Sequence, residues 1–115
     1  MPGQEAAAVI KVQTQLLPCF TYRGHVPQSV FDMATSHAWN FGASATCNSG
    51  AMKAWNVGDW ATGCRRMARG DDGSLVWASV KTGKKLANGQ PEYRFVQGLA
   101  NRRADEADRC AKGLP

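Results

Sequence analysis

The sequence contains no long apolar run. No segment of the 115-residue chain approaches the roughly 18 consecutive apolar residues that a membrane-spanning helix needs. The apolar patch near the start, Ala6 to Ile10, follows Glu5 and lacks the basic flank of a signal peptide. We therefore expect neither a membrane span nor a signal peptide in this chain.

The local motifs of several enzyme classes are also missing. There is no Gly-x-Ser-x-Gly nucleophile elbow and no glycine-rich phosphate loop. His25 and His37 have no cysteine or carboxylate at ligand spacing, and the four cysteines are too widely separated for the close pairs of a typical zinc site. The pattern predicts no metal ion and no cofactor, and we expect both histidines on the surface or in loops.

Basic residues are frequent but do not form a run. The net charge is +5 and the pI is near 9.3, yet the 14 lysines and arginines are spread along the chain. This distribution indicates diffuse attraction to polyanions such as bacterial walls. Because no basic residues cluster on one helix, we expect no nucleic-acid partner.

Length and continuity favour one domain spanning residues 1–115. A chain of this size can bury one core, and no repeat, low-complexity tract or linker divides it. Apolar residues recur at helical spacing, Pro18 ends the first helix, and Pro27 suits the first turn of the second. Serine and aspartate often cap the start of a helix, so Ser49 and Asp59 are expected to do so. We expect helices over residues 4–17, 27–42, 49–58, 59–67 and 99–111.

The residue composition changes between the last two of these helices. Four glycines punctuate residues 70–97, and Leu75–Val80 and Tyr93–Val96 have the composition of short strands. We interpret this part as an inserted hairpin or long loop. The predicted fold class is mainly α: a small helical bundle with one irregular insertion.

Three segments carry a resemblance to a known family. They are Trp39–Gly42, the turn Asn56–Trp60, and Gly98–Arg103, which is followed by Glu106 and Cys110. Together they resemble the C-terminal lobe of the phage-type lysozymes, the endolysins that cut peptidoglycan. The resemblance runs from about residue 5 to residue 110. It implies a lysozyme-like helical fold and a glycoside hydrolase, a muramidase that cleaves the β-1,4 bond between N-acetylmuramic acid and N-acetylglucosamine.

The resemblance also implies roles for individual residues. Asn40 is expected to hydrogen-bond sugar groups, with Trp39 and Phe41 beside it in the substrate-binding segment, and Arg102 or Arg103 to hold the catalytic glutamate. From the residues alone, Arg103 lies on or beside the apolar stripe of its helix and needs a carboxylate from elsewhere in the fold. Two simpler readings stay open at this point: an ion pair of Arg102 with Glu106, and an asparagine that only ends a helix.

The family's catalytic segment has a glutamate, then an aspartate or cysteine, then a threonine. Glu5, Glu92 and Glu106 are not followed by that pattern, and Asp32, although flanked by apolar residues, falls as readily on a polar helix face. We therefore assign no catalytic residue. The catalytic lobe is expected to precede Met1.

This expectation describes a truncated or split lysozyme, inactive alone, whose catalytic lobe a separate chain could carry. It would be made in the host cytoplasm and act in the periplasm on the cell wall. The alternative is a non-catalytic cell-wall-binding or lysozyme-like interaction protein.

The cysteines admit more than one state. Similar endolysins often carry cysteines at these places, and this resemblance implies disulfides between Cys19 and Cys47 and between Cys64 and Cys110. Each would stabilise the fold by roughly 3 to 4 kcal/mol on the chain-entropy model. Four buried thiols are the alternative.

Overall fold

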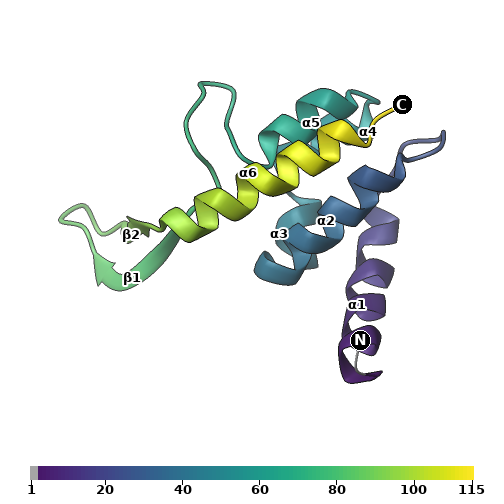
Figure 1. Cartoon of the computed structure of the whole chain (residues 1–115). Coiled ribbons are helices and arrows are strands. Elements are labelled where there is room, and N and C mark those ends of the chain that lie inside the picture. The colour runs from purple at the N-terminus through teal and green to yellow at the C-terminus, as the bar shows by residue number, and fades with distance from the viewer. Residues whose placement is uncertain (1–2) are drawn as a thin grey trace.

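A computed structural model describes residues 3–115, with side chains from residue 7 onward. It is a mainly α fold with one small antiparallel sheet, as the sequence predicts (Figure 1). The elements in chain order are α1 (Gly3–Leu16), the short 3-10 helix η1 (Leu17–Cys19), α2 (Gln28–Phe41), α3 (Ala43–Cys47), α4 (Gly50–Asn56), α5 (Trp60–Arg66), β1 (Ser79–Lys85), β2 (Pro91–Phe95) and α6 (Gln97–Lys112). None of the described helices combines the length and apolarity needed to cross a bilayer.

The helix ends follow from local chemistry. The Ser49 side chain accepts a hydrogen bond from the backbone N–H of Met52, and Asp59 accepts one from that of Thr62. The hydrogen bonds from Thr62 lower the pKa of Asp59. These contacts satisfy backbone donors that a helix start leaves open, so both predicted caps are confirmed. Helix α3 was not expected, because a glycine at position 42 indicates the end of a helix. In the structure Gly42 has a φ of 90° and separates α2 from α3.

The predicted strands differ from the observed ones. Leu75–Val80 was expected as a strand, but β1 begins only at Ser79, and β2 covers Pro91–Phe95. Leu75 forms only an isolated bridge with Arg69, and the residues after it turn toward the helical body: the Val76 N–H bonds the Ala68 carbonyl, and Trp77 has a positive φ of 59°. An apolar run does not reveal whether its side chains pair across a sheet or pack onto helices.

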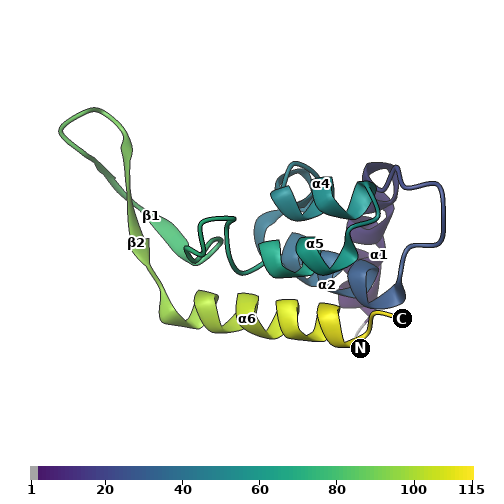
Figure 2. The ribbon, with the colours of Figure 1, turned by 90° about the horizontal axis from the view of Figure 1, so that it is seen from above.

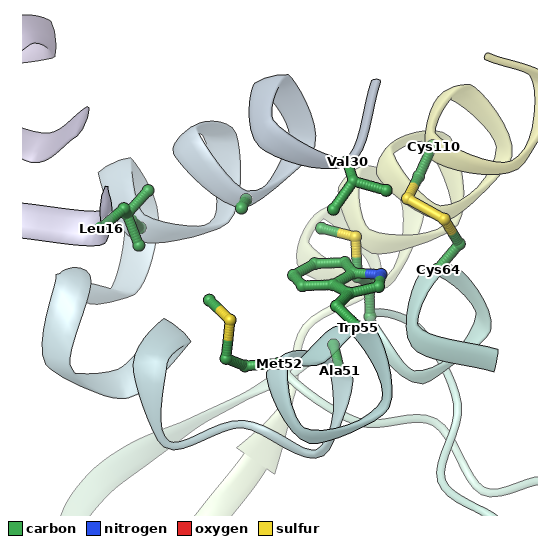
Figure 3. Close-up of a cluster of buried hydrophobic side chains, with 10 residues drawn as sticks. Leu16, Val30, Ala51, Met52, Trp55, Cys64 and Cys110 are labelled. Carbon is green, nitrogen blue, oxygen red and sulfur yellow. A yellow bond between two sulfur atoms is a disulfide. The ribbon is translucent and has the colours of Figure 1, made fainter. Parts of the chain in front are cut away.

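Trp55 occupies the middle of the core, fully buried among aliphatic side chains and sulfur (Figure 3). The disulfide Cys64–Cys110 lies against this core and joins α5 to α6, and Cys19–Cys47 joins η1 to α3. The pairing expected from the resemblance is therefore the pairing in the structure. Cys64–Cys110 thus ties α5 to α6, which bears part of the candidate site.

A single glycine determines how closely α5 approaches Trp55. A Cβ atom on Gly63 would lie 2.2 Å from Cδ1 and Nε1 of Trp55 and 2.9 Å from the Ala51 carbonyl oxygen. Gly63 is buried, so the neighbouring atoms cannot move into solvent. The spacing of α4 and α5 thus depends on the missing side chain.

Gly63→Ala should lower the free energy of unfolding by roughly 1–3 kcal/mol because it overpacks this contact. Gly98→Ala is the matched control: Gly98 is also helical, and nothing lies within 4 Å of its added Cβ. The control should stabilise the chain slightly, since alanine is the better helix former. Urea unfolding measures both, and equal midpoints for the two variants would contradict the packing argument.

Candidate functional site

The structure joins two residues that the resemblance singled out separately. Arg102 on α6 donates a hydrogen bond from Nη1 to Oδ1 of Asn40 on α2, at 3.2 Å and 62 residues away in sequence. Asn40 in turn donates from Nδ2 to the Ser36 carbonyl, at 2.9 Å. Both side chains are exposed, so the pair lies at the surface between the two helices.

A buried ion pair lies on the inner side of the same helix. Arg103 and Glu106 are 1% and 4% exposed, and Nε of Arg103 donates to Oε1 of Glu106 at 2.6 Å. The hydroxyl of Ser36 donates to the other carboxylate oxygen. The carboxylate therefore has a donor on each oxygen, one from α6 and one from α2.

This pair corrects two expectations. Arg103 was expected to need a carboxylate from elsewhere in the fold, and Arg102 was the alternative partner of Glu106. Both are wrong, because residues three apart on a helix share a face and the inward face of α6 carries Arg103 together with Glu106. The spacing of the two residues was present in the sequence and could have shown the pair.

Phe41 supports the guanidinium. The Cζ atom of Arg103 lies 4.7 Å from the centre of the Phe41 ring, a distance typical of a cation–π contact. Nη1 and Nη2 of Arg103 are buried and have no hydrogen-bond partner among the residues that the structure describes. Phe41 is half-buried here, whereas Trp39 beside Asn40 is 53% exposed. Of the two predicted aromatic neighbours of Asn40, only Trp39 is open to a ligand.

His37 belongs to the interior of the site. It was expected on the surface, but it is 2% exposed, its Nδ1 lies 2.7 Å from the Thr46 hydroxyl, and its ring packs against Phe41. Burial, and then the positive charge of Arg103, lower its pKa from 6.5 to about 4. His37 is therefore neutral near pH 7. His25 is exposed, as expected.

Trp77 covers this cluster from the loop that leads into the hairpin. Its ring meets the His37 ring edge-on at 4.5 Å and the Phe41 ring at 5.1 Å between centres. Among the described residues it is the one non-glycine with a positive φ, a conformation that costs about 1–3 kcal/mol. No sequence signal marks it, because positive φ is favoured by glycine or asparagine rather than tryptophan.

A basic hollow adjoins Trp77. It has a volume of about 340 Å³, and its lining includes Lys53, Arg66, Arg69 and Asp71. Arg66 is paired with Asp71, at 3.0 Å, so the hollow keeps a positive balance of charge.

The other carboxylates are further candidates for a catalytic acid. Asp32 is exposed and accepts a hydrogen bond from Gln28. Most of the rest serve surface ion pairs, turns or a helix cap: Asp59, Asp71, Asp72, Asp105 and Asp108. The Glu5 side chain lies outside the described residues. Within the described part of the chain, no three histidine, cysteine or acidic side chains form a group that could hold a metal ion.

Glu106→Gln should lower the free energy of unfolding by about 3–5 kcal/mol, because it leaves the Arg103 cation buried without a counter-charge. Asp105→Asn is the control; it removes a surface ion pair of Asp105 and Arg109, both more than half exposed, and should cost less than about 1 kcal/mol. Chemical denaturation measures both. Replacing the pair by Arg103→Met with Glu106→Leu should recover most of the loss, and similar losses in Glu106→Gln and Asp105→Asn would refute the assignment.

The lowered pKa of His37 makes stability depend on pH. The folded chain leaves His37 unprotonated down to about pH 4, whereas the unfolded chain protonates it near pH 6.5. The unfolded state therefore binds more protons in this window, and the free energy of unfolding falls as the pH falls from 6.5 to 4, by at most about 1.4 kcal/mol per pH unit.

His37→Gln should remove that contribution, so its curve of stability against pH should be flatter than that of the native chain over this window. The exposed His25 provides the control, since His25→Gln should leave the pH dependence of stability as it is in the native chain. Parallel curves for the native chain and His37→Gln would contradict the burial of a neutral imidazole.

Known proteins provide an independent comparison. The family model described as phage lysozyme matches residues 5–106. An endolysin from the Escherichia coli O157:H7 phage FAHEc1 superposes with a TM-score of 0.71 and 23% identity over 99% of this chain, and the match covers 65% of that endolysin. The muramidase domain of SpmX from Asticaccaulis excentricus gives a TM-score of 0.59 and 22% identity over 100% of this chain and 69% of that one.

No curated protein matches the chain in sequence. The structural likeness shows a shared fold, and the chain spans about two thirds of the length of the endolysin. The family match extends over most of the chain and includes the Trp39–Gly42 segment and Arg102, Arg103 and Glu106. This chain belongs to the phage lysozyme family.

Proposed function

We propose that this chain is the peptidoglycan-binding C-terminal lobe of a lysozyme that hydrolyses the β-1,4 bond between N-acetylmuramic acid and N-acetylglucosamine. The observation that carries the proposal is the contact between Asn40 and Arg102 at the surface. The family resemblance gives one of them a role with the sugar and the other a role with the acid. A lysozyme needs both functions at one place, and the contact brings their two residues together.

The pair has free donors for such a ligand. The Arg102 guanidinium carries five N–H groups, of which one bonds Asn40, and the Asn40 amide keeps a second N–H beyond its bond to Ser36. The acceptors on peptidoglycan are N-acetyl carbonyls, hydroxyls and carboxylates. Trp39, exposed beside Asn40, offers an apolar surface for a sugar ring. These groups match the chemistry of the proposed substrate.

Hydrolysis also requires a carboxylic acid that protonates the leaving oxygen. Glu106 is bonded on both oxygens and is buried, so we place the acid on a segment outside the described residues, either of the same protein or of a separate chain. Arg102 would hold that carboxyl group through its free N–H groups. A neighbouring guanidinium favours the ionised form of a carboxyl group, so it would also help the acid release its proton.

A second candidate function is binding without catalysis. The engagement of Glu106 by Arg103 and Ser36 favours it, because a buried carboxylate that accepts hydrogen bonds on both oxygens is unsuited to act as the acid. In that case the same surface would bind the wall and the protein would act as a cell-wall-binding or lysozyme-like interaction module. In either role its place of action is the cell wall in the periplasm, after synthesis in the cytoplasm of the host.

Binding to purified peptidoglycan sacculi tests the proposed surface. Asn40→Ala and Arg102→Gln should each raise the dissociation constant about tenfold, the equivalent of one charge-assisted hydrogen bond of roughly 1.4 kcal/mol. Arg65→Gln, a change of the same charge at an exposed position on α5, is the control and should stay within twofold. Equal losses in Arg65→Gln and Arg102→Gln would show that only net charge matters.

Release of reducing ends from sacculi separates the two candidate functions. The chain alone should release none, and adding a polypeptide with the family's glutamate-containing segment should produce activity that Arg102→Gln reduces. Activity of the chain alone would show that one of its own carboxylates is the acid. Binding without activity in the mixture would favour the binding module.

A further inference from the structure

The hairpin of β1 and β2 stands apart from the helical body. It continues beyond the N-terminal end of α6, and no helix covers it in either view (Figure 2). Every residue of β1 is exposed, and so is every residue of β2 except the half-buried Glu92. The backbone bond from Val96 N–H to the Ala78 carbonyl closes its base, next to Trp77 and the start of α6. The proposed functions of Asn40 and Arg102 do not use this element.

The strand register places two aromatic rings on one face of the hairpin. Ser79 pairs with Phe95 and Lys81 pairs with Tyr93, so these four side chains project on the same side, whereas the pair of Val80 with Arg94 projects on the other. We call the first side the aromatic face. Tyr93 and Phe95 are 57% and 48% exposed, and they follow each other along the strand at a spacing of about 6.6–7 Å.

The hairpin also carries a net positive charge. Residues 79–95 contain three lysines and one arginine against one glutamate, a net charge of +3. Lys81 lies directly opposite Tyr93 on the aromatic face. An exposed pair of rings with a lysine beside it, on a hairpin of net positive charge, is complementary to a polymer that offers apolar ring faces and carboxylates together.

We propose that the aromatic face binds the glycan strands of peptidoglycan, with Tyr93 and Phe95 against successive sugar rings and the lysines near the carboxylates of the stem peptides. This inference rests on the proposed function, which makes peptidoglycan the partner. It adds a second contact on the substrate, outside the Asn40–Arg102 surface and at the end of α6 nearer to Arg102. The hairpin would then hold a strand while the rest of the protein acts on it.

The shape of the hairpin favours a glycan over a membrane surface. Binding to a lipid surface strengthens with the apolar area that the membrane buries, so a hairpin that inserts by its tip needs several apolar side chains there. Here Leu86, 48% exposed, is the one large apolar side chain at the tip. The turn that follows it is Ala87-Asn88-Gly89-Gln90, in which Asn88 accepts a hydrogen bond from the Gln90 N–H, and the two aromatic rings lie in the body of β2. The rings are thus available along the side of the ribbon, where an extended polymer can lie.

The test compares the native chain with a double variant that carries both Tyr93→Ala and Phe95→Ala. The double variant should bind sacculi at least fivefold more weakly, and it should lose the same factor for a tetramer of β-1,4-linked N-acetylglucosamine, which carries no charge. Sedimentation with sacculi and calorimetry with the tetramer measure the two affinities. The double variant should unfold at the native midpoint, because both rings lie outside the core.

Two controls isolate the rings. Val80→Ala removes an exposed apolar side chain from the opposite face and should change neither affinity by more than twofold. Tyr93→Phe with Phe95→Tyr keeps both rings and should bind as the native chain does. Lys81→Gln should weaken binding to sacculi but not to the uncharged tetramer.

Unchanged binding of the double alanine variant to sacculi would overturn the inference, and if Asn40→Ala and Arg102→Gln still weaken binding, the proposed function would stand without it. The reverse result, in which only the hairpin variants weaken binding, would support the aromatic face and refute the Asn40–Arg102 surface. Binding of the native chain to anionic phosphatidylglycerol vesicles but not to sacculi or the tetramer would refute both.

Discussion

The buried ion pair of Arg103 and Glu106 is the constraint on which the candidate site depends. Removing two charges from water costs several kcal/mol for each ion, so the surrounding structure has to supply close partners. Ser36 from α2 bonds the carboxylate, and the Phe41 ring lies under the guanidinium. The pair therefore determines how α2 and α6 face each other. Burial, and then the positive charge of Arg103, lower the pKa of His37 and keep its ring neutral near pH 7.

Helix α6 carries this constraint along its length. Arg103, Glu106 and Cys110 follow each other at helical spacing on its inward face, and the disulfide to Cys64 anchors the end of that face to α5. The ion pair holds the middle of the helix and the disulfide holds its C-terminal part. The N-terminal part is left to carry Arg102 at the surface and to continue into the hairpin (Figure 2). Helix α6, held at these two places, thus positions both the surface around Arg102 and the hairpin.

Much of the fold could be predicted from the sequence because local rules decide it. Pro18, Ser49 and Asp59 mark helix ends by their own backbone or side-chain chemistry, and these ends are where the structure has them. The late start of β1 could not be predicted, because it depends on Trp77 packing onto the helical body in an unusual backbone conformation. The burial of His37 was visible in its spacing, three residues after Ala34 and seven after Val30 on the buried face of α2. Of the site, the meeting of Asn40 and Arg102 required the tertiary structure, whereas the pair of Arg103 with Glu106 was visible in their spacing.

The two adjacent arginines divide their tasks because successive residues on a helix point about 100° apart. Arg103 points inward, and its partner Glu106 is unsuited to be a proton donor: both of its oxygens already accept hydrogen bonds, and protonating it would leave the buried guanidinium without a counter-charge. Arg102 points outward and keeps most of its N–H groups free for a group that arrives from outside. Arg103 therefore holds the helix in place through its buried ion pair, and Arg102 supplies the hydrogen-bond donors at the surface. Under the proposed function, this surface would orient an incoming carboxyl group against a sugar, and the proton for glycosidic cleavage would come from that carboxyl group.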